Sequence, residues 1–434
     1  MDRNAIVGET AADAVGVLRV QIWLVFLVPA GLRIESLGAL GNPALLWTAV
    51  LGMVWVGTTF GPTVVRPCAP VRWVLASFVG VTLLSYAVAH RSPVAADEAS
   101  NADRFVIAAL GLSALALVAA EGLPDRERVL DVVRTLVAAS AVMSLVAVLQ
   151  HRGIVDLVQL VRRTPGLSEY QPLTPVLARS GLNRPAGTAT HPIEFGVVSA
   201  VVLAFAAHLA VFDRSWGPVR RLGALSAIAV AVPISVSRSA LLVAAVVGVV
   251  FAATVPPSVR RRASWFAVGV VVGVFVLVPG LLGTLRGLVV AGRSDPSIST
   301  RTSDYDAVFP FVVERPWLGR GPGTFLPRFR ILDNQYLLSL VETGVVGLVA
   351  LVALFAAVPV LGAAARRWAV EEQDRQLGAM FVAAGFGLLV AMVTFDGLSF
   401  PMFTMVAMLV LGSGGAWWSA VRRPAAALVP EAVR

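Results

Sequence analysis

The sequence has little charge and no lysine. Only 14% of its 434 residues are charged, whereas soluble domains have about 25%. Together with a hydrophobic content of 57%, this shortage excludes a soluble globular enzyme and a disordered chain. All 35 basic residues are arginine, a planar fork that suits phosphate or carboxylate and stays charged. Cys68 is the single cysteine, which excludes an intrachain disulfide and a zinc framework.

Long apolar segments are the dominant feature. A membrane-spanning helix needs about 20 mostly apolar residues, and the hydrophobic content fills roughly twelve such helices. The sequence therefore predicts an all-α, polytopic membrane protein that forms one transmembrane domain over residues 1–434. The expected spans are 17–34, 43–60, 72–89, 103–120, 129–150, 192–211, 221–236, 238–255, 264–283, 335–360, 376–395 and 398–420.

The arginines predict the orientation. With twelve spans, nineteen arginines of the termini and short connections fall on one face and four on the other, so the first face is expected to be cytoplasmic. Both termini are then cytoplasmic, and the protein lies in the inner or plasma membrane. Because the net charge of +9 is spread over many loops, we expect no nucleic-acid partner.

Two long connections, 151–191 and 284–334, fall on the extracytoplasmic face. Loops of this length are usually functional or disordered, and their apolar and aromatic residues favour folded loops that contain short helices. The amphipathic stretch Ile154 to Arg163 is interpreted as an interfacial helix.

A short pair of spans predicts a sunken turn. Residues 221–255 are fewer than the about 40 that two full crossings need. The turn at 233–239 is therefore expected below the outer surface, with Arg238 in a pocket open to the outside. A charge at membrane depth is usually functional or paired, although a snorkelling arginine is the simpler reading.

Two polar clusters stand where long loops enter spans. The first runs from Asn183 to Gly196 and contains Arg184, Thr188, His191 and Glu194. Thr190 or His191 is expected to precede the helix, near its positive end, where anions bind. A capped helix with a solvated arginine is the alternative.

The second cluster contains Asp333, Asn334, Tyr336 and Glu342. Asp333 is a plausible N-cap, and Glu342 needs a partner such as an arginine. We expect Asp396 only to cap the last helix. An outward pocket rich in arginine suits phosphate, and outside the cytoplasm a phosphate-bearing substrate is expected to be lipid-linked.

The motifs resemble the O-antigen ligase and polymerase superfamily of polytopic glycosyltransferases. They are Arg184-x-x-Gly187-Thr188, Ser237-Arg238-Ser239-Ala240, Arg301 followed by the stretch 316–323, Asn334-x-Tyr336-Leu337 and Glu342-x-Gly344. The resemblance covers about residues 170–360.

The resemblance implies metal-independent, inverting transfer of a glycan from a polyprenyl-pyrophosphate donor to a glycan or lipid acceptor, without a cofactor. It implies that Arg184, Arg238 and Arg301 bind the pyrophosphate. In many relatives a histidine precedes the Asn-x-Tyr motif, and here that position is Asp333. Asp333 is a weak base unless desolvated, so His191 or Glu194 could share the role. A transporter or flippase of an anionic lipid-linked substrate remains the alternative.

Overall fold

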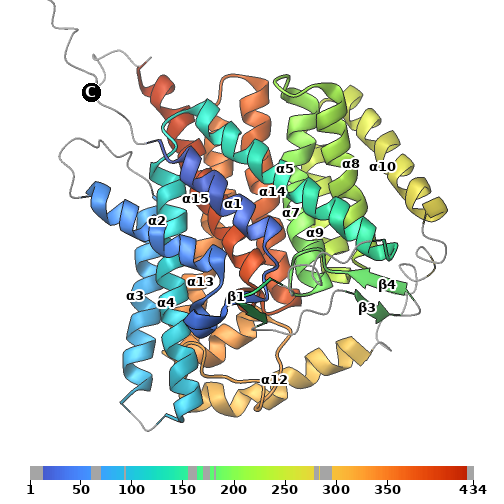
Figure 1. Ribbon diagram of the computed structural model, residues 1–434. Helices are drawn as coiled ribbons and strands as arrows, with labels where there is room; N and C mark the ends of the chain where they lie inside the picture. Colours follow the sequence, from blue (N-terminus) through green and yellow to red (C-terminus); the bar gives the residue numbers. More distant parts are fainter. Residues whose placement is uncertain are drawn as a thin grey trace, which may run out of the picture.

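The computed structural model is a bundle of long helices (Figure 1). It describes residues 13–59, 70–91, 94–154, 164–169, 176–179, 182–277, 283 and 296–427. The α-helices are α1 (Val15–Leu27), α2 (Pro43–Thr59), α3 (Val71–Ala89), α4 (Ala96–Glu121), α5 (Arg126–His151), α7 (Pro192–Phe212), α8 (Pro218–Ile234), α9 (Arg238–Thr254), α10 (Pro257–Leu277), α12 (Pro296–Glu314), α13 (Gln335–Trp368), α14 (Glu372–Thr394) and α15 (Pro401–Ala427). The short 3-10 helices are η1 (Glu35–Leu40) and η3 (Gly397–Ser399), and the strands are β1 (Leu32–Ile34), β2 (Leu167–Glu169), β3 (Val176–Arg179) and β4 (Leu182–Pro185).

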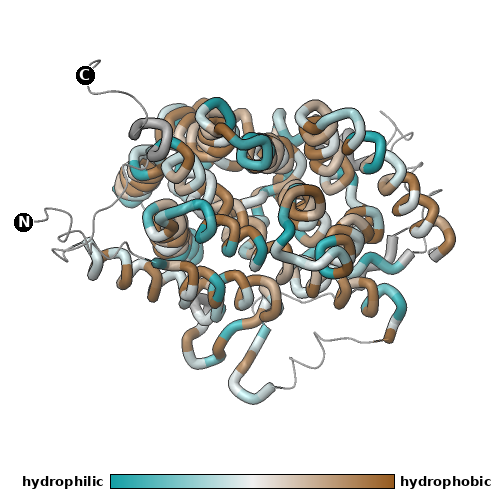
Figure 2. The backbone as a smooth tube through the Cα atoms, turned by 90° about the horizontal axis from the view of Figure 1, so that it is seen from above, coloured by the Kyte–Doolittle hydropathy of each residue, from teal (hydrophilic) through white to brown (hydrophobic). Residues whose placement is uncertain are grey.

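The helices identify a multi-pass membrane protein. Within the described ranges, seven helices are long and apolar enough to cross a bilayer, and α1, α2 and α9 are shorter apolar helices. Figure 2 shows hydrophobic residues on the outside of the bundle as well as between its helices, as expected where lipid replaces water. Each of the twelve predicted segments overlaps a helix, while the number of crossings stays a prediction.

One expectation about local structure is wrong. The first apolar segment does not continue as a helix to residue 34, because α1 ends at Leu27, shortly before Pro29. The predominantly helical fold is confirmed, and two short strand ladders accompany the helices. The connection after α1 pairs with the first long loop as the antiparallel ladder β1–β2, and β3–β4 forms a second ladder inside that loop. The predicted interfacial helix at 154–163 lies almost wholly outside the described residues.

The two ends of the bundle differ in character. The strands, α12 and the connection between α12 and α13 lie at one end, which we call the loop end (Figure 1). The opposite end, the arginine end, has ion pairs that join α5 to other helices or to the residues beside them: Arg134–Asp213 at 2.8 Å, Arg126–Asp374 at 2.7 Å and Arg128–Asp13 at 2.8 Å. The described parts of both long connections therefore lie at the same end, as the predicted topology requires.

A break in α13 joins this helix to the loop before it. Gly344 has φ +67°, so the helical hydrogen bonds are interrupted there. The segment 316–321 lies in the break: Arg320 and Gly321 donate backbone N–H groups to the carbonyls of Val341 and Glu342 at 3.1 and 2.8 Å. In return, Val345 and Val346 donate to the carbonyls of Pro316 and Trp317 at 2.9 and 3.2 Å. The glycine-rich stretch therefore supplies the backbone partners that the broken helix lacks.

We predict that Gly344→Ala destabilises the protein. A side chain at this positive φ costs about 1 to 3 kcal/mol, and a Cβ would also press against the backbone of Trp317. The thermal midpoint of the purified protein should fall by several degrees. Gly248→Ala is the control, because a Cβ there meets nothing within 4 Å. Equal midpoints for the two variants would contradict the role given to the break.

We predict that the loop end faces the outside of the cell. In a Cys68→Ser background, a membrane-impermeant maleimide should label Ile331→Cys in intact cells and Val370→Cys only after lysis. Ile331 at the loop end is 69% exposed and Val370 at the arginine end is 76% exposed, so access to the reagent is matched. The reverse labelling pattern would overturn the orientation.

Candidate functional site

A cavity of about 730 Å³ opens at the loop end of the bundle. Its walls come from the α1–α2 connection, α4, the start of α7, residues 323–332, the first turns of α13 and the α14–α15 connection. Apolar side chains make most of the lining. The titratable and charged members are Arg33, Arg104, His191, Arg330, Glu342 and Asp396. The cavity is thus an amphipathic chamber with both cations and carboxylates.

The segment before α7 is held by contacts to α5 and α1. The side-chain amide of Gln150 donates to the carbonyl of Gly187 at 3.0 Å and accepts from its N–H at 2.9 Å. Thr188 donates its hydroxyl to the carbonyl of Phe26 at 2.7 Å. Gly187 has φ +62°, which explains why glycine stands there. Thr188 therefore connects this segment to the end of α1, and its supporting role in a site stays a prediction.

Arg184 is buried beside the turn between α8 and α9. Its Nε donates to the carbonyl of Ser235 at 3.0 Å, and its side chain lies outside the lining of the 730 Å³ cavity. The turn itself is buried, with Ser235 and Val236 at 0% exposure. The turn is therefore enclosed by protein, and its depth below the outer membrane surface stays a prediction.

Arg238 is the first residue of α9. Ser237 is the N-cap and accepts from the backbone N–H of Ala240 at 3.3 Å. A cation at a helix N-terminus is unfavourable, because the helix dipole is positive there. Arg238 is half-buried and, like Arg184, is not part of the cavity lining. The two arginines are therefore placed near one turn, outside the cavity.

His191 lies between that turn and the cavity. It is the N-cap of α7, and its Nδ1 accepts from the backbone N–H of Ile193 at 3.1 Å. Burial, with a contribution from the positive charge of Arg184, lowers the pKa of His191 to about 4. The neutral ring therefore carries its proton on Nε2, so His191 is arranged to donate a hydrogen bond rather than to take a proton.

Glu194 has a structural set of partners. Its Oε2 accepts from the N–H and the hydroxyl of Thr190, both at 2.8 Å. Its Oε1 accepts from the N–H groups of Met402 and Phe403 at 2.8 and 3.1 Å, in the first turn of α15. Glu194 is 0% exposed and does not line the cavity. The expected catalytic role therefore has no geometric support, because both oxygens are used by helix termini.

The start of α13 differs from expectation by one residue. Asn334, not Asp333, is the N-cap, and its Oδ1 accepts from the N–H groups of Tyr336 and Leu337 at 3.0 and 3.1 Å. The hydroxyl of Tyr336 donates to the carbonyl of Leu389 on α14 at 2.8 Å. Asp333 is exposed and does not line the cavity. The Asn-x-Tyr motif thus anchors the helix.

Gln335 connects α13 to the α14–α15 connection. Its backbone N–H donates to the carbonyl of Phe395 at 3.2 Å, and its Oε1 accepts from the N–H of Leu398 at 2.8 Å. Asp396 lies between these two contacts and lines the cavity. Burial raises the pKa of Asp396 to about 6; a hydrogen bond with Ser399 opposes the rise, and the negative charge of Asp333 adds to it.

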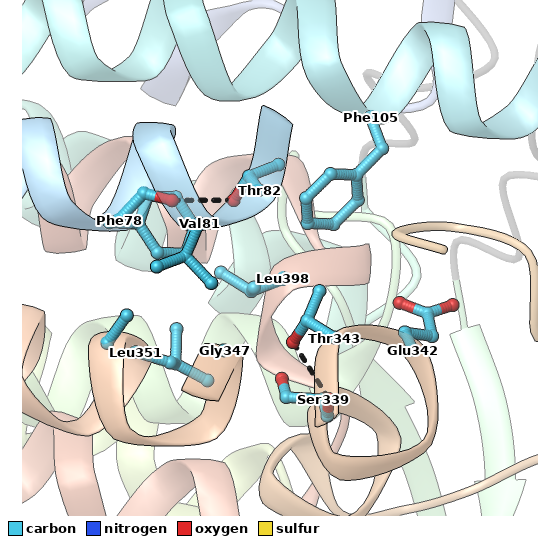
Figure 3. A pocket seen from close by; sticks show the side chains of 11 residues that line it. Phe78, Val81, Thr82, Phe105, Ser339, Glu342, Thr343, Gly347, Leu351 and Leu398 are labelled. Carbon is cyan, nitrogen blue, oxygen red and sulfur yellow. Dashed lines mark hydrogen bonds between the residues drawn. The ribbon is translucent and has the colours of Figure 1, made fainter. Parts of the chain in front are cut away.

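Glu342 lies between two spaces of different size. It lines the large cavity and also a buried space of about 10 Å³ between α3, α4 and α13, where Ser339 and Thr343 are its neighbours (Figure 3). A space of this size holds about one water. The carboxylate accepts from the N–H of Phe325 at 3.1 Å. Among the described residues, no arginine lies within ion-pair distance of Glu342, so the expected partner is replaced by a backbone donor.

Two arginines of the second long loop hold it in place. Arg320 pairs with Glu98 at 3.2 Å and lies over the ring of Phe329. Arg330 pairs with the buried Asp304 of α12 and extends to the cavity. Arg301 lies on α12, but its side chain is outside the described residues.

The sequence reasoning missed three charged residues of the cavity: Asp396, Arg104 and Arg33, of which Arg33 was counted only for orientation. Asp396 stands in a short connection and was assigned to helix capping, yet it makes no side-chain cap. Arg104 of α4 was counted only for orientation, and it forms no ion pair or hydrogen bond with a described residue. Its position eight residues into α4 at the loop end was the available signal.

Comparison with known families agrees with the motifs. Residues 223–352 match the O-antigen ligase family, a stretch that runs from α8 into α13. No curated protein matches the chain. The match confirms the resemblance to the O-antigen ligase superfamily.

We predict that Glu194 acts through stability. Glu194→Ala removes the acceptors of four hydrogen bonds, and a typical hydrogen bond contributes about 0.5 to 1.5 kcal/mol. The thermal midpoint should fall strongly. Glu194→Gln keeps one acceptor oxygen for the first turn of α15 and should retain much of the stability. Normal midpoints with activity lost in both variants would instead support a catalytic role.

Proposed function

We propose that this chain, which matches the O-antigen ligase family over residues 223–352, transfers a glycan from a polyprenyl-pyrophosphate donor to an acceptor hydroxyl at the extracytoplasmic face of the membrane. The observation that carries the proposal is the cavity at the loop end. There, a histidine fixed as a donor and a carboxylate with raised pKa line a single space.

The donor pyrophosphate binds beside the α8–α9 turn. Arg184 and Arg238 flank this turn, and an arginine fork binds phosphate oxygens in bidentate fashion. The N-termini of α7 and α9 supply further positive potential. An anion here also relieves the unfavourable position of Arg238 at the start of α9. Arg301 on α12 is the third proposed ligand.

His191 stabilises the leaving group. Its Nε2–H is free of the capping contact that occupies Nδ1, and its low pKa keeps the ring neutral. A hydrogen bond from Nε2 to a phosphate oxygen strengthens as negative charge develops on that oxygen.

Asp396 is the proposed general base. A base works best when its pKa is near the working pH, and burial gives Asp396 such a value. Asp333, at the position of the histidine in relatives, is exposed and acts on Asp396 through its charge. We assign Asp333 a tuning role and Asp396 the proton transfer, in place of the base role expected for Asp333.

The reaction is a single displacement. The acceptor oxygen forms a bond to the anomeric carbon while the bond from that carbon to the phosphate oxygen breaks. The electron pair leaves with the pyrophosphate, and the hydroxyl proton passes to the Asp396 carboxylate. Attack from the side opposite the leaving group inverts the anomeric centre. Binding both substrates in one site supplies much of the rate.

The family match does not favour the transporter alternative. Product formation by the purified protein in detergent distinguishes a transferase from a transporter.

We predict that Asp396→Asn lowers kcat at least about 100-fold, the usual scale for a lost general base. The base must be deprotonated, so the activity of the native protein should fall as the pH drops through about 6. Asp333→Asn should remain active and move this acid limb to lower pH, because a like charge near Asp396 is removed. The measurement is the pH profile of kcat with a defined lipid-linked donor.

Asp306→Asn is the matched control, since Asp306 is an exposed carboxylate at the same end and should change neither kcat nor the profile. An inactive Asp333→Asn protein beside an active Asp396→Asn protein would return the base role to Asp333.

A further inference from the structure

A second large cavity lies at the arginine end. It measures about 510 Å³ and is formed by α9, α13 and α14. Its lining has four apolar side chains, one threonine and three arginines: Val250, Thr254, Ala363, Arg366, Arg367, Arg375, Ala379 and Val382. The function proposed above uses none of these residues.

The three arginines keep most of their capacity to bind an anion. Arg375 donates Nε to the carbonyl of Ala369 at 3.0 Å, and Arg366 makes only a long contact of 3.5 Å to a carbonyl. Arg367 forms no hydrogen bond or ion pair with a described residue. Among the described residues, Arg366 and Arg367 therefore form no ion pair that would neutralise their charge.

The nearby carboxylates do not cancel this charge. Glu372 lies 4.0 Å from Arg375, with both side chains about half exposed, a pair of the kind that contributes little. Glu371 accepts a hydrogen bond from Gln373. Asp374 is paired with Arg126 at 2.7 Å. None of these three carboxylates lines the cavity, whose charged lining residues are all arginine.

The apolar side of the cavity indicates the chemistry of the part of the ligand that does not contact the arginines. Val250, Ala363 and Val382 are only partly buried and lie beside the arginines. A free phosphate would leave this wall in contact with water, whereas a lipid would cover it. Basic pockets between helices at the cytoplasmic side are suited to anionic lipid headgroups. The combination favours an amphipathic anion with a phosphate and a hydrocarbon chain.

We propose that this cavity binds an anionic phospholipid of the cytoplasmic leaflet, with its phosphate among Arg366, Arg367 and Arg375 and an acyl chain along Val250 and Val382. The proposal depends on the predicted orientation of the arginine end and not on the glycosyl transfer. Such a lipid would bridge α9, α13 and α14. It would thereby stabilise α13 and α14. At their opposite ends, α13 begins with Gln335 and α14 ends shortly before Asp396.

The test compares two lipids on delipidated protein in detergent. Phosphatidylglycerol should bind in native mass spectrometry and raise the thermal midpoint, and phosphatidylcholine should do neither at the same concentration. In Arg366→Gln/Arg367→Gln, the apparent affinity for phosphatidylglycerol should fall at least tenfold. The control is Arg261→Gln/Arg262→Gln, two adjacent exposed arginines at the same end that lie outside the cavity lining; it should bind as the native protein does.

A second variant covers the case in which the arginine variant misfolds. Ala363→Phe fills the apolar wall and keeps all three arginines, and it should also lower the affinity. Three results would overturn the proposal. The control variant could lose as much affinity as the arginine variant, or phosphatidylcholine could bind as well as phosphatidylglycerol. The third is that inorganic phosphate alone raises the thermal midpoint by the same amount. Because the readouts are binding and stability, they are independent of transferase activity.

Discussion

The break of α13 at Gly344 is the constraint on which the loop end depends. A broken helix inside a membrane protein leaves carbonyls and N–H groups that no water can satisfy. The segment 316–321 satisfies four of them, so the second long loop is fixed to the helix bundle rather than to its own core alone. That fixation brings Phe325 into contact with Glu342 and Arg330 to the rim of the cavity. A Cβ at Gly319 would meet the backbone of Glu342, just as one at Gly344 would meet Trp317, so both glycines are required by the same close approach.

Helix beginnings account for much of the remaining polar chemistry. α7, α9, α13 and α15 all begin at the loop end, and each directs the positive end of its dipole there. His191, Ser237, Asn334 and Glu194 satisfy their first N–H groups. Three of these four residues were expected from the sequence to bind substrate, support it or act on it. A capping residue is fixed in place by its helix, and for His191 this fixation also decides which ring nitrogen remains for a ligand.

The sequence predicts the helices well and the site only in part. Apolar runs of sufficient length set the positions of the spans, because burial in lipid requires them whatever their partners are. The strands β1 and β2 could not be predicted, since they pair residues more than 130 positions apart. Asp396 was missed for a related reason: its burial and its neighbour Asp333 come from two different connections that only the fold brings together. The one-residue error at Asp333 arose because aspartate and asparagine are equally good N-caps, so the sequence alone does not separate them.

The absence of lysine has a consequence for how the site responds to pH. Arginine keeps its charge throughout the physiological range, so the cations at both ends of the bundle are constant. His191 has a pKa of about 4 and is already neutral well below pH 7. Outside the spanning helices, Asp396 is then the described group of the cavity whose charge changes near neutral pH. A site that combines fixed cations with a titrating carboxylate outside the spanning helices separates two tasks: holding an anionic donor, which should not depend on pH, and taking a proton from the acceptor, which should.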